Sequence, residues 1–559
     1  MMSTWKTCYP RPQLRRDSFL PLLDGWKLNG NPITLPFCPE SLLSGYEGEL
    51  GMSMTYETTF TLPKTFLPRG HRLLLHFGAV DQIADVYWNG VHVAHHGGGY
   101  LPFTADVTNA LSEGENVLCV KVTDSLVNTP HGYGKQKYKR GGIWYTATSG
   151  IWQTVWMESV PQNYIESVEI TPDFDLHRIY WRVRSPKPVN AKVVVRVNGQ
   201  CIAEDWEEEN GKGWSLILPE YFRPWSPEDP YLYDLEITMG SDTVKSYVAM
   251  RKFGTVEHEG HKVLALNGRP YFHNGLLDQG YWSDGLYTAP SDAALIYDIS
   301  TMKSLGFNML RKHIKIEPLR WYYHCDRLGM LVWQDMVNNG SYNFIRDTAI
   351  STVFSKKGLR YHLKDKEPKS KLKQFFLEHS KQTIQHLHNH PCVVYYTIFN
   401  EGWGQFNANY AYKVLKQVDS SRIYDTASGW FKNPKSDVES DHIYFKTPSL
   451  IDRAKKCKKP LIISECGGYT LAVKNHLWNP KAKYGYGSCN SSQELTQKIV
   501  EMYQKMIIPA VKEGICGCVY TQLSDVEDEI NGFFTYDREI CKVEKEKMLE
   551  ISKVLFLTK

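Results

Sequence analysis

Two acidic residues stand at the ends of apolar segments and could act together in catalysis. Glu401 follows Asn400 at the end of the run 393–399, which begins shortly after a proline. Glu465 ends the run 461–464, and glycines follow at 467 and 468. Short apolar runs bounded by Pro or Gly are typical of strands buried on both faces of a parallel sheet. A carboxyl group at the mouth of such a strand is poorly solvated, which raises its pKa toward the range that a general acid needs.

Two carboxyl groups delivered by two strands suit the hydrolysis of a glycosidic bond. A glutamate at a strand end can also serve only in a salt bridge, and Glu401 considered alone fits either interpretation. The second segment, which ends in Glu465, favours catalysis.

The two segments resemble glycoside hydrolase family 2, which includes β-galactosidases and β-glucuronidases. The resemblance implies a (β/α)₈ barrel with Glu401 as the acid/base on strand four and Glu465 as the nucleophile on strand seven, in a retaining double displacement. It also implies that Asn400 binds the sugar 2-hydroxyl, that Arg311 keeps the nucleophile ionised, and that Tyr444 donates a hydrogen bond to it. The structural alternatives are a strand-end cap for Asn400, a surface arginine and a packed core tyrosine.

The chain from residue 256 alternates apolar strands with helical segments, which predicts βαβ units. Eight strands are expected at 271–277, 307–313, 330–335, 393–400, 423–428, 442–445, 461–465 and 516–522, with helices at 291–305, 318–328, 372–388 and 493–513. The two glutamates fall on the fourth and seventh of these strands. Eight parallel strands close a barrel whose active site lies at their carboxyl ends. The polar stretch 337–371 is predicted to be a loop over that site.

The first 255 residues predict two β domains. In residues 1–160, short alternating runs are separated by turn signals such as Asn89-Gly90, which favours a β-sandwich. The stretches 9–13, 36–41 and 149–153 resemble the jelly-roll sugar-binding domain of family 2. Residues 161–255 carry another strand series, with a turn at Asn198-Gly199, and resemble the family's immunoglobulin-like domain. We therefore expect a jelly roll (1–160), an immunoglobulin-like sandwich (161–255) and a catalytic TIM barrel (256–559).

Further candidates for substrate binding lie at or just past predicted strand ends. These are Asp278, His313, Asp335, Trp430, Gln522 and Asp525. A tryptophan in this position could stack on a sugar ring, and each of the six could equally have a structural role. In the first domain, Asp124 resembles an acidic residue that reaches the sugar in relatives.

The sugar specificity rests on a departure from the family pattern. In β-glucuronidases an Asn-x-Lys pair holds the sugar carboxylate, whereas Glu529 and Asn531 stand at those positions here. Because Glu529 would repel a uronic acid, we predict a β-galactosidase-like exo-β-glycosidase. β-Glucuronidase and β-galactofuranosidase activities are the alternatives. The glutamate could instead face solvent and select nothing, or another cation could hold a uronic acid, for which Lys312, Lys315 and Arg538 are the candidates.

Two other positions depart from the family. His313 lies one position early relative to the Arg-x-x-His of many relatives, and Tyr520-Thr521-Gln522 stands where they carry a strand-eight tryptophan.

Composition limits the remaining classes of function. The 559 residues suggest three or four domains, and a net charge of +4 is too small to indicate nucleic acid or membrane binding. No export signal or 18-residue apolar run is visible, which favours a cytoplasmic protein. The 12 cysteines are scattered without zinc-binding spacing, so reduced thiols and no metal are expected.

The mechanism requires no cofactor, the expected partner is a carbohydrate, and a homo-oligomer is possible. A catalytically silent carbohydrate-binding protein is the rival class. The presence of both glutamates, Asn400 and Arg311 argues against it.

Overall fold

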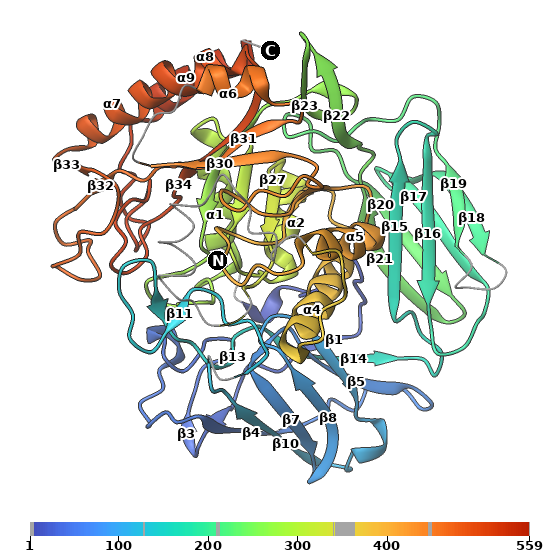
Figure 1. The fold of residues 1–559 in the computed structure, drawn as a ribbon. Helices are drawn as coiled ribbons and strands as arrows, with labels where there is room; N and C mark the ends of the chain where they lie inside the picture. Colours follow the sequence, from blue (N-terminus) through green and yellow to red (C-terminus); the bar gives the residue numbers. More distant parts are fainter. Residues whose placement is uncertain are drawn as a thin grey trace.

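Three domains follow one another along the chain (Figure 1). The computed structural model describes residues 5–126, 129–207, 213–338, 340, 364–444 and 450–557. A β domain (blue) is followed by a second β domain (green-cyan) and by a barrel with its helices (green to red). The predicted multidomain fold class is confirmed.

The first domain is a sandwich of two antiparallel sheets. One sheet has the order β1 (Phe19–Pro21), β14 (Val155–Val160), β5 (Arg72–Phe77) and β9 (Phe103–Asp106). The other has the order β3 (Asn31–Pro32), β2 (Lys27–Leu28), β4 (Ser53–Thr61), β10 (Glu115–Thr123), β7 (Ile83–Trp88) and β8 (Val91–Gly97). Buried and exposed residues alternate along β4 and β10, as expected for strands with one face on a core. The predicted Asn89-Gly90 turn joins β7 to β8 with φ of 50° and 81°, which these two residue types tolerate.

Shorter elements complete this domain. They are β6 (Val80–Asp81) paired with β13 (Gly150–Ile151), β11 (Gln136–Lys137) paired with β12 (Tyr145–Thr146), and the 3₁₀ turns η1 (Trp5–Thr7), η2 (Leu42–Ser44) and η3 (Thr108–Ala110). The β11–β12 pair belongs to the segment 131–149, which reaches the barrel.

The second domain is also a sandwich. One sheet contains β15 (Ser167–Asp173), β16 (Arg178–Arg184) and β19 (Trp214–Ile217). The other contains β18 (Gln200–Glu207), β17 (Ala191–Val197), β20 (Tyr233–Met239) and β21 (Asp242–Val248). Both sheets contribute to one core, with Ile170, Trp181, Val193 and Ile237 among its buried residues. A small sheet, β22 (Phe253–His258), β23 (His261–Leu266) and β24 (Arg269–Pro270), precedes the barrel, so the predicted boundary at 255 falls within β22.

The barrel contains eight parallel strands. They are β25 (His273–Asp278), β26 (Met309–Lys312), β27 (Leu331–Asp335), β28 (Val393–Thr397), β29 (Ile423–Asp425), β30 (Glu439–Ile443), β31 (Leu461–Gly467) and β34 (Ile515–Thr521). The helices are α1 (Asp292–Ser304), α2 (Leu319–Leu328), α4 (Lys371–Leu387), α5 (Ala408–Val418), α6 (Leu450–Lys456), α7 (Ser492–Met502), α8 (Ile508–Val511) and α9 (Lys545–Leu557). A short pair, β32 (Thr470–Leu471) and β33 (Ser488–Cys489), follows β31.

Backbone hydrogen bonds join the eight strands side by side in the order β29, β28, β27, β26, β25, β34, β31 and β30. Among the described residues no ladder joins β29 to β30. Their seam is bridged by single bonds, from the Asp437 amide to the Tyr424 carbonyl (3.0 Å) and from the Gly429 amide to Ser440 Oγ (3.2 Å).

Two predicted elements differ from the structure. The sixth strand was expected at 442–445, but β30 begins at Glu439 and ends at Ile443, and residue 445 lies outside the described residues. An apolar pattern does not locate this strand, because β30 contains mostly polar residues. The helix expected at 493–513 is interrupted after Met502 by a π-helical turn, Tyr503–Ile507. Pro509 lacks an N–H group and clashes with an earlier carbonyl, which accounts for the interruption.

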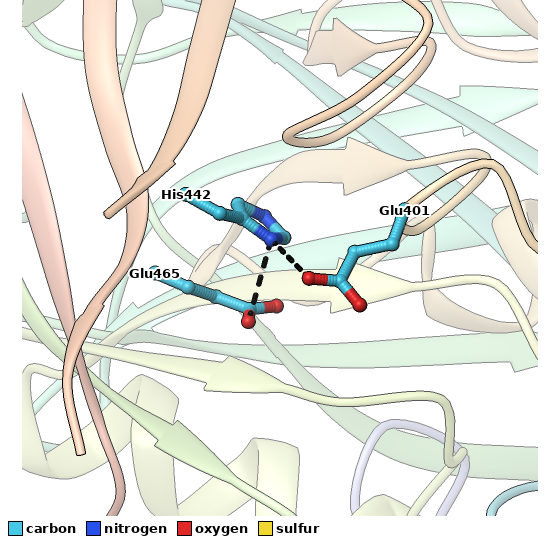
Figure 2. Close-up of side chains that lie close together, drawn as sticks. All are labelled: Glu401, His442 and Glu465. Carbon is cyan, nitrogen blue, oxygen red and sulfur yellow. Dashed lines mark hydrogen bonds and ion pairs between the residues drawn. The ribbon is translucent and has the colours of Figure 1, made fainter. Parts of the chain in front are cut away.

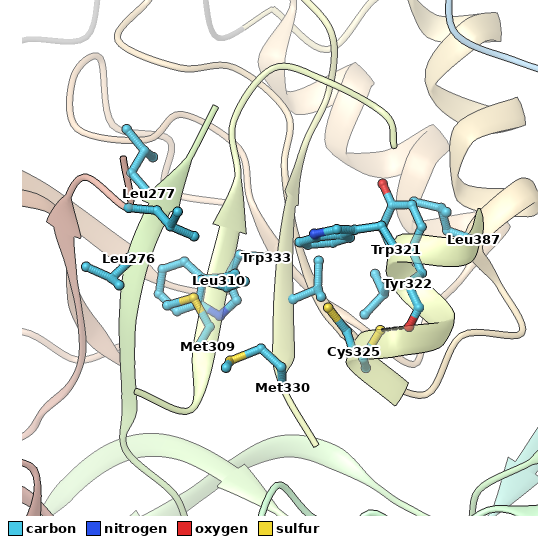
Figure 3. Close-up of a cluster of buried hydrophobic side chains, with 14 of the residues drawn as sticks. Leu276, Leu277, Met309, Leu310, Trp321, Tyr322, Cys325, Met330, Trp333 and Leu387 are labelled. Carbon is cyan, nitrogen blue, oxygen red and sulfur yellow. Dashed lines mark hydrogen bonds between the residues drawn. The ribbon is translucent and has the colours of Figure 1, made fainter. Parts of the chain in front are cut away.

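A dense apolar core holds the strands in place. Figure 3 shows buried side chains of β25, β26 and β27 packed with those of α2 and with Leu387 of α4. The contacting residues include Leu276, Met309, Leu310, Trp321, Tyr322, Cys325 and Trp333. Such packing leaves little freedom for the strand ends, which carry the polar residues described below.

The segment 131–149 of the first domain is bonded to the mouth of the barrel. Asn338 Nδ2 donates to the Gly134 carbonyl (2.7 Å), and the Thr146 amide donates to Glu527 Oε1 (3.0 Å). The Tyr145 hydroxyl donates to Glu529 Oε2 (2.5 Å). The predicted loop 337–371 contributes only its described ends, because residues 339 and 341–363 lie outside the described residues.

Two expectations from composition can be compared with the structure. All 12 cysteines are free thiols, and Cys516 and Cys518 are buried in β34. Among the described helices, none is both long and apolar enough to cross a lipid bilayer.

Candidate active site

A cavity of about 940 Å³ lies at the carboxyl ends of the barrel strands, with the segment 131–149 as part of its wall. Its polar lining includes both predicted catalytic glutamates. The lining residues that matter below are Lys135, Lys137, Trp144, His313, Asn400, Glu401, Trp403, Trp430, His442, Tyr444, Glu465, Tyr484, Tyr486 and Glu529.

Glu465 lies on β31 at the bottom of this cavity, and its carboxylate accepts two strong hydrogen bonds. Arg311 Nη1 donates to Oε1 (3.0 Å) and the Tyr444 hydroxyl donates to Oε2 (2.6 Å). Burial alone would raise the pKa of Glu465, but the charges of His442 and Arg311 outweigh burial and hold that pKa below its ordinary value. The group is therefore ionised at neutral pH, as a nucleophile must be.

Arg311 on β26 is buried and donates to several groups at once. Besides Glu465, its guanidinium donates to Asp335 Oδ1 (3.0 Å), Asn400 Oδ1 (2.8 Å) and the Ser464 carbonyl (2.9 Å). These bonds fix the position of the Glu465 carboxylate relative to the Asn400 side chain. Burial opposes its charge, but Asp335 and Glu465 raise the pKa of Arg311.

Glu401 follows β28 and projects into the cavity with 27% of its side chain exposed. Its backbone has φ of 51°, in the left-handed region that non-glycine residues rarely adopt, and its amide donates to the Ser428 carbonyl (3.0 Å). Figure 2 shows the His442 ring between the two glutamates. His442 Nδ1 lies 2.7 Å from Glu401 Oε1 and 3.4 Å from Glu465 Oε2.

The two carboxyl groups lie close enough together for a retaining enzyme. One oxygen of Glu401, one of Glu465 and a ring nitrogen of His442 lie within 4.8 Å of one another. Retaining glycosidases hold their carboxyl groups about 5–5.5 Å apart, and inverting ones hold them about 6.5–9.5 Å apart to admit a water molecule.

The structure brings together six of the predicted residues at the cavity. Asn400, Glu401, Tyr444 and Glu465 line it, together with His313 and Trp430. Arg311 and Asp335 lie directly beneath, where Asp335 Oδ2 is 2.6 Å from His313 Nδ1.

The four remaining predicted residues lie away from this cavity. Asp278 Oδ2 accepts from Lys312 (2.6 Å), and Asp525 Oδ1 accepts from Lys542 (2.6 Å), so both carboxylates are used in buried ion pairs. Gln522 is buried, with its amide donating to Asn531 (2.9 Å). Asp124 borders a separate cavity of the first domain, together with Glu40 and Tyr138.

The three cations considered as partners for the carboxylate of a uronic acid also do not line this cavity. Lys312 pairs with Asp278 and Glu317, Lys315 also pairs with Glu317, and Arg538 contacts Asp298. Glu529, by contrast, is 2% exposed and lines the cavity, so the alternative in which it faces solvent is wrong. Asn531 Nδ2 donates to Glu529 Oε1 (3.0 Å).

Sequence reasoning missed two groups of cavity residues. Lys135, Lys137 and Trp144 come from the first domain, and no strand pattern links them to the barrel. Lys137 Nζ lies 3.9 Å from the centroid of the Trp144 ring. His442 could have been found, because residues two apart on a strand share a face and Tyr444 was already a candidate.

Two clusters among the described residues could hold a metal ion. One is Glu401, His442 and Glu465, and the other is the more exposed group His476, Asp537 and Glu539. The expectation that the protein needs no metal stays a prediction.

Fold and site together define a glycosidase with a catalytic TIM barrel, and comparison with known proteins gives its family. The family model "Glycosyl hydrolases family 2, TIM barrel domain" matches residues 259–546. The galactose-binding-domain-like model of family 2 matches 49–151, and a third family 2 model matches 163–254. The chain belongs to glycoside hydrolase family 2, a retaining family, which confirms the predicted family and enzyme class.

Individual relatives are distant. A β-glucuronidase of Felis catus is 25% identical over an alignment of 530 positions, which covers 84% of this chain and 75% of that protein. A β-galactosidase large subunit of Leuconostoc lactis is 24% identical, over 71% of this chain and 62% of that subunit. Among solved structures, a β-glucuronidase of an uncultured Clostridium sp. superposes with a TM-score of 0.69 at 22% identity, covering 94% of this chain and 92% of that one.

Proposed function

We propose that the protein is an exo-acting retaining β-glycosidase that removes terminal β-linked uronic acids, as a β-glucuronidase does. The observation that carries the hydrolytic part is the pair of carboxyl groups in one cavity. Glu465 is held ionised by Arg311 and Tyr444, while Glu401 is placed within reach of the same bond.

The reaction proceeds in two displacements. Glu465 attacks the anomeric carbon and forms a glycosyl ester, while Glu401 gives its proton to the leaving oxygen, so an alcohol departs. A water molecule then attacks the same carbon and gives its proton to Glu401, and the ester bond to Glu465 breaks. Asn400, fixed by Arg311, would hold the sugar 2-hydroxyl through both steps.

The proposal of a uronic acid replaces the neutral sugar expected from Glu529. Two lysines, Lys135 and Lys137, line the cavity, and burial lowers the pKa of Lys137, which a bound carboxylate would oppose. Glu529 already accepts hydrogen bonds from Tyr145 and Asn531, which partly offset its charge. Two of the three relatives described above are named β-glucuronidases.

A β-galactosidase is the second candidate. Glu529 places an additional carboxylate in the cavity. A carboxylate accepts hydrogen bonds from the hydroxyl groups of a neutral sugar, whereas it repels the carboxylate of a uronic acid. The Leuconostoc lactis relative bears that name.

The test is kcat/KM for nitrophenyl β-glucuronide, β-galacturonide, β-galactoside and β-glucoside, measured side by side. We expect a uronide to be cleaved at least about tenfold better than any neutral sugar, the effect of one favourable ion pair. If a neutral glycoside is cleaved best, the proposed preference for uronic acids is wrong, while the proposed glycosidase activity stands. A chain that binds sugars and hydrolyses none would be a carbohydrate-binding protein.

A further inference from the structure

We propose that His442 is a positioning residue that shares one proton with Glu401 and so keeps this carboxyl group loaded for its acid step. The inference rests on the retaining mechanism proposed above, but it is independent of which sugar is cleaved.

The position of His442 on β30 brings its ring between the two catalytic groups (Figure 2). Its side chain is only 1% exposed. Nδ1 approaches Glu401 Oε1 at 2.7 Å, a distance typical of a charge-assisted bond, while Glu465 Oε2 is farther away at 3.4 Å. The closer partner is thus the acid/base, while the hydrogen bonds to the nucleophile come from Arg311 and Tyr444.

The far side of the ring determines which nitrogen carries the fixed proton. Nε2 lies 3.2 Å from Ser428 Oγ, and that hydroxyl donates its own hydrogen to Ser464 Oγ (2.9 Å). Ser428 can therefore accept from His442, which places a hydrogen on Nε2. Nδ1 and Glu401 Oε1 then hold one further proton between them, on either atom.

Charged groups on the neighbouring strands favour keeping that proton. Glu401 after β28 and Glu465 on β31 face the ring, whereas Arg311 on β26 opposes its charge. On β30 itself, Asp441 pairs with Lys432 and Arg453. Burial lowers the pKa of His442, but the two carboxylates outweigh burial and raise it above the ordinary value.

The shared proton balances through the proposed reaction. In the free enzyme the pair Glu401–His442 holds one proton, and it leaves with the alcohol when the glycosyl ester forms. Water returns one proton to the pair when the ester is hydrolysed. Imidazole binds a proton more tightly than a carboxylate, with ordinary pKa values of about 6.5 and about 4.3, so the pair stays loaded to a higher pH than a carboxyl group alone.

The experiment compares His442→Asn and His442→Phe with a control, His390→Asn. Asparagine can still donate a hydrogen bond to Glu401, but it cannot hold the proton. His390 is a buried histidine with a similar contact, Nδ1 to Asp326 Oδ2 at 2.7 Å, and it does not line the cavity. The measurement is the pH profile of kcat/KM for aryl glycosides of the preferred sugar, with good (dinitrophenyl) and poor (phenyl) leaving groups.

We expect both His442 variants to lose about tenfold to a hundredfold in kcat/KM for the phenyl glycoside at the wild-type optimum. The dinitrophenyl glycoside, whose departure needs little acid help, should change less than about threefold. The alkaline limb should move to lower pH by about one unit, because the pair has lost its stronger base. The His390 variant should keep the wild-type limb.

Three outcomes would overturn the assignment. They are an unmoved alkaline limb, equal losses for both leaving groups, and loss of activity on dialysis against a chelator in the wild type and in a His476→Ala variant alike, which would assign a metal to the cluster of Glu401, His442 and Glu465. A wild-type enzyme that cleaves no aryl glycoside would instead reject the proposed function, so the two failures are distinguishable.

Discussion

The floor of the cavity and its N-terminal wall are built in different ways. The floor comprises Arg311, Asp335, Tyr444 and Glu465 of the barrel, joined by hydrogen bonds of 2.6–3.0 Å. The N-terminal wall comprises Lys135, Lys137 and Trp144 of the segment 131–149, where Lys137 lies over the Trp144 ring and Lys135 over the ring of Tyr145. A buried ionic network holds reacting atoms in one geometry, whereas long side chains over aromatic rings can adapt to a ligand. The difference suggests that the barrel performs the reaction and that the first domain selects the sugar.

The largest effect should come from the floor, through Glu465→Ala. Without the nucleophile, kcat should fall by about 10⁴-fold or more for every sugar. Added azide should enter the vacated space and restore part of the turnover as a glycosyl azide of inverted configuration, detectable by NMR. Near wild-type turnover of the variant would show that Glu465 is not the nucleophile.

Arg311→Met tests whether the floor acts as one charged unit. Removing the guanidinium takes away the cation that Asp335 and Glu465 share, and breaking a buried ion pair in this way costs about 3–5 kcal/mol of folding free energy. The pKa of Glu465 is held down partly by Arg311, so it should rise in the variant and the acid limb of kcat/KM should move to higher pH. Arg422→Met is the matched control, since Arg422 is buried and pairs with Asp419 (2.9 Å) away from the cavity. It should lower stability, measured by denaturant unfolding, but leave the limb in place.

The N-terminal wall should respond to Lys135→Met and Lys137→Met. If these cations hold a uronic acid, each variant should lose about tenfold to a hundredfold in kcat/KM for the β-glucuronide, as expected for one hydrogen bond to a charged group. Neutral galactosides should change less than about threefold. Lys139→Met, an exposed lysine of the same segment, serves as the control. Equal losses in kcat/KM for charged and neutral sugars would show that the N-terminal wall does not select the sugar.

The smallest effect is expected from Trp144→Leu. The ring packs edge-on against Trp403, with centroids 5.1 Å apart. If the Trp144 ring also packs on the aryl group of the substrate, losing that contact of about 0.5–1.5 kcal/mol should raise KM for aryl glycosides about threefold to tenfold and leave kcat unchanged. A fall in kcat would mean that Trp144 positions the reacting groups and that the division between floor and wall is not complete.

The sequence predicted the floor well because its residues end buried strands. Strand spacing placed Glu401 and Glu465 on the fourth and seventh strands, and Arg311 and Asp335 on two others, so their convergence follows from barrel geometry. Asp278 and Asp525 also follow strands, but each is neutralised by a lysine from elsewhere in the barrel, Lys312 and Lys542. A one-dimensional pattern does not reveal such pairing.

The N-terminal wall could not be predicted in the same way. Its residues lie at least 257 positions before Glu401 along the chain, on a segment whose contacts to the barrel depend on how two domains dock. The predicted sugar preference consequently rested on Glu529 and Asn531, without Lys135 and Lys137 of the same cavity.

The left-handed backbone of Glu401 has a consequence for how this protein can evolve. A non-glycine residue in that conformation costs about 1–2 kcal/mol, a sizeable part of the net stability of most folds. Asparagine tolerates the conformation better, and glycine adopts it freely. Mutations that stabilise the fold are therefore available at the position that we propose for the acid/base. In lineages that are no longer selected for hydrolysis, residue 401 should change to Asn or Gly. Such proteins should be more stable and still bind sugars.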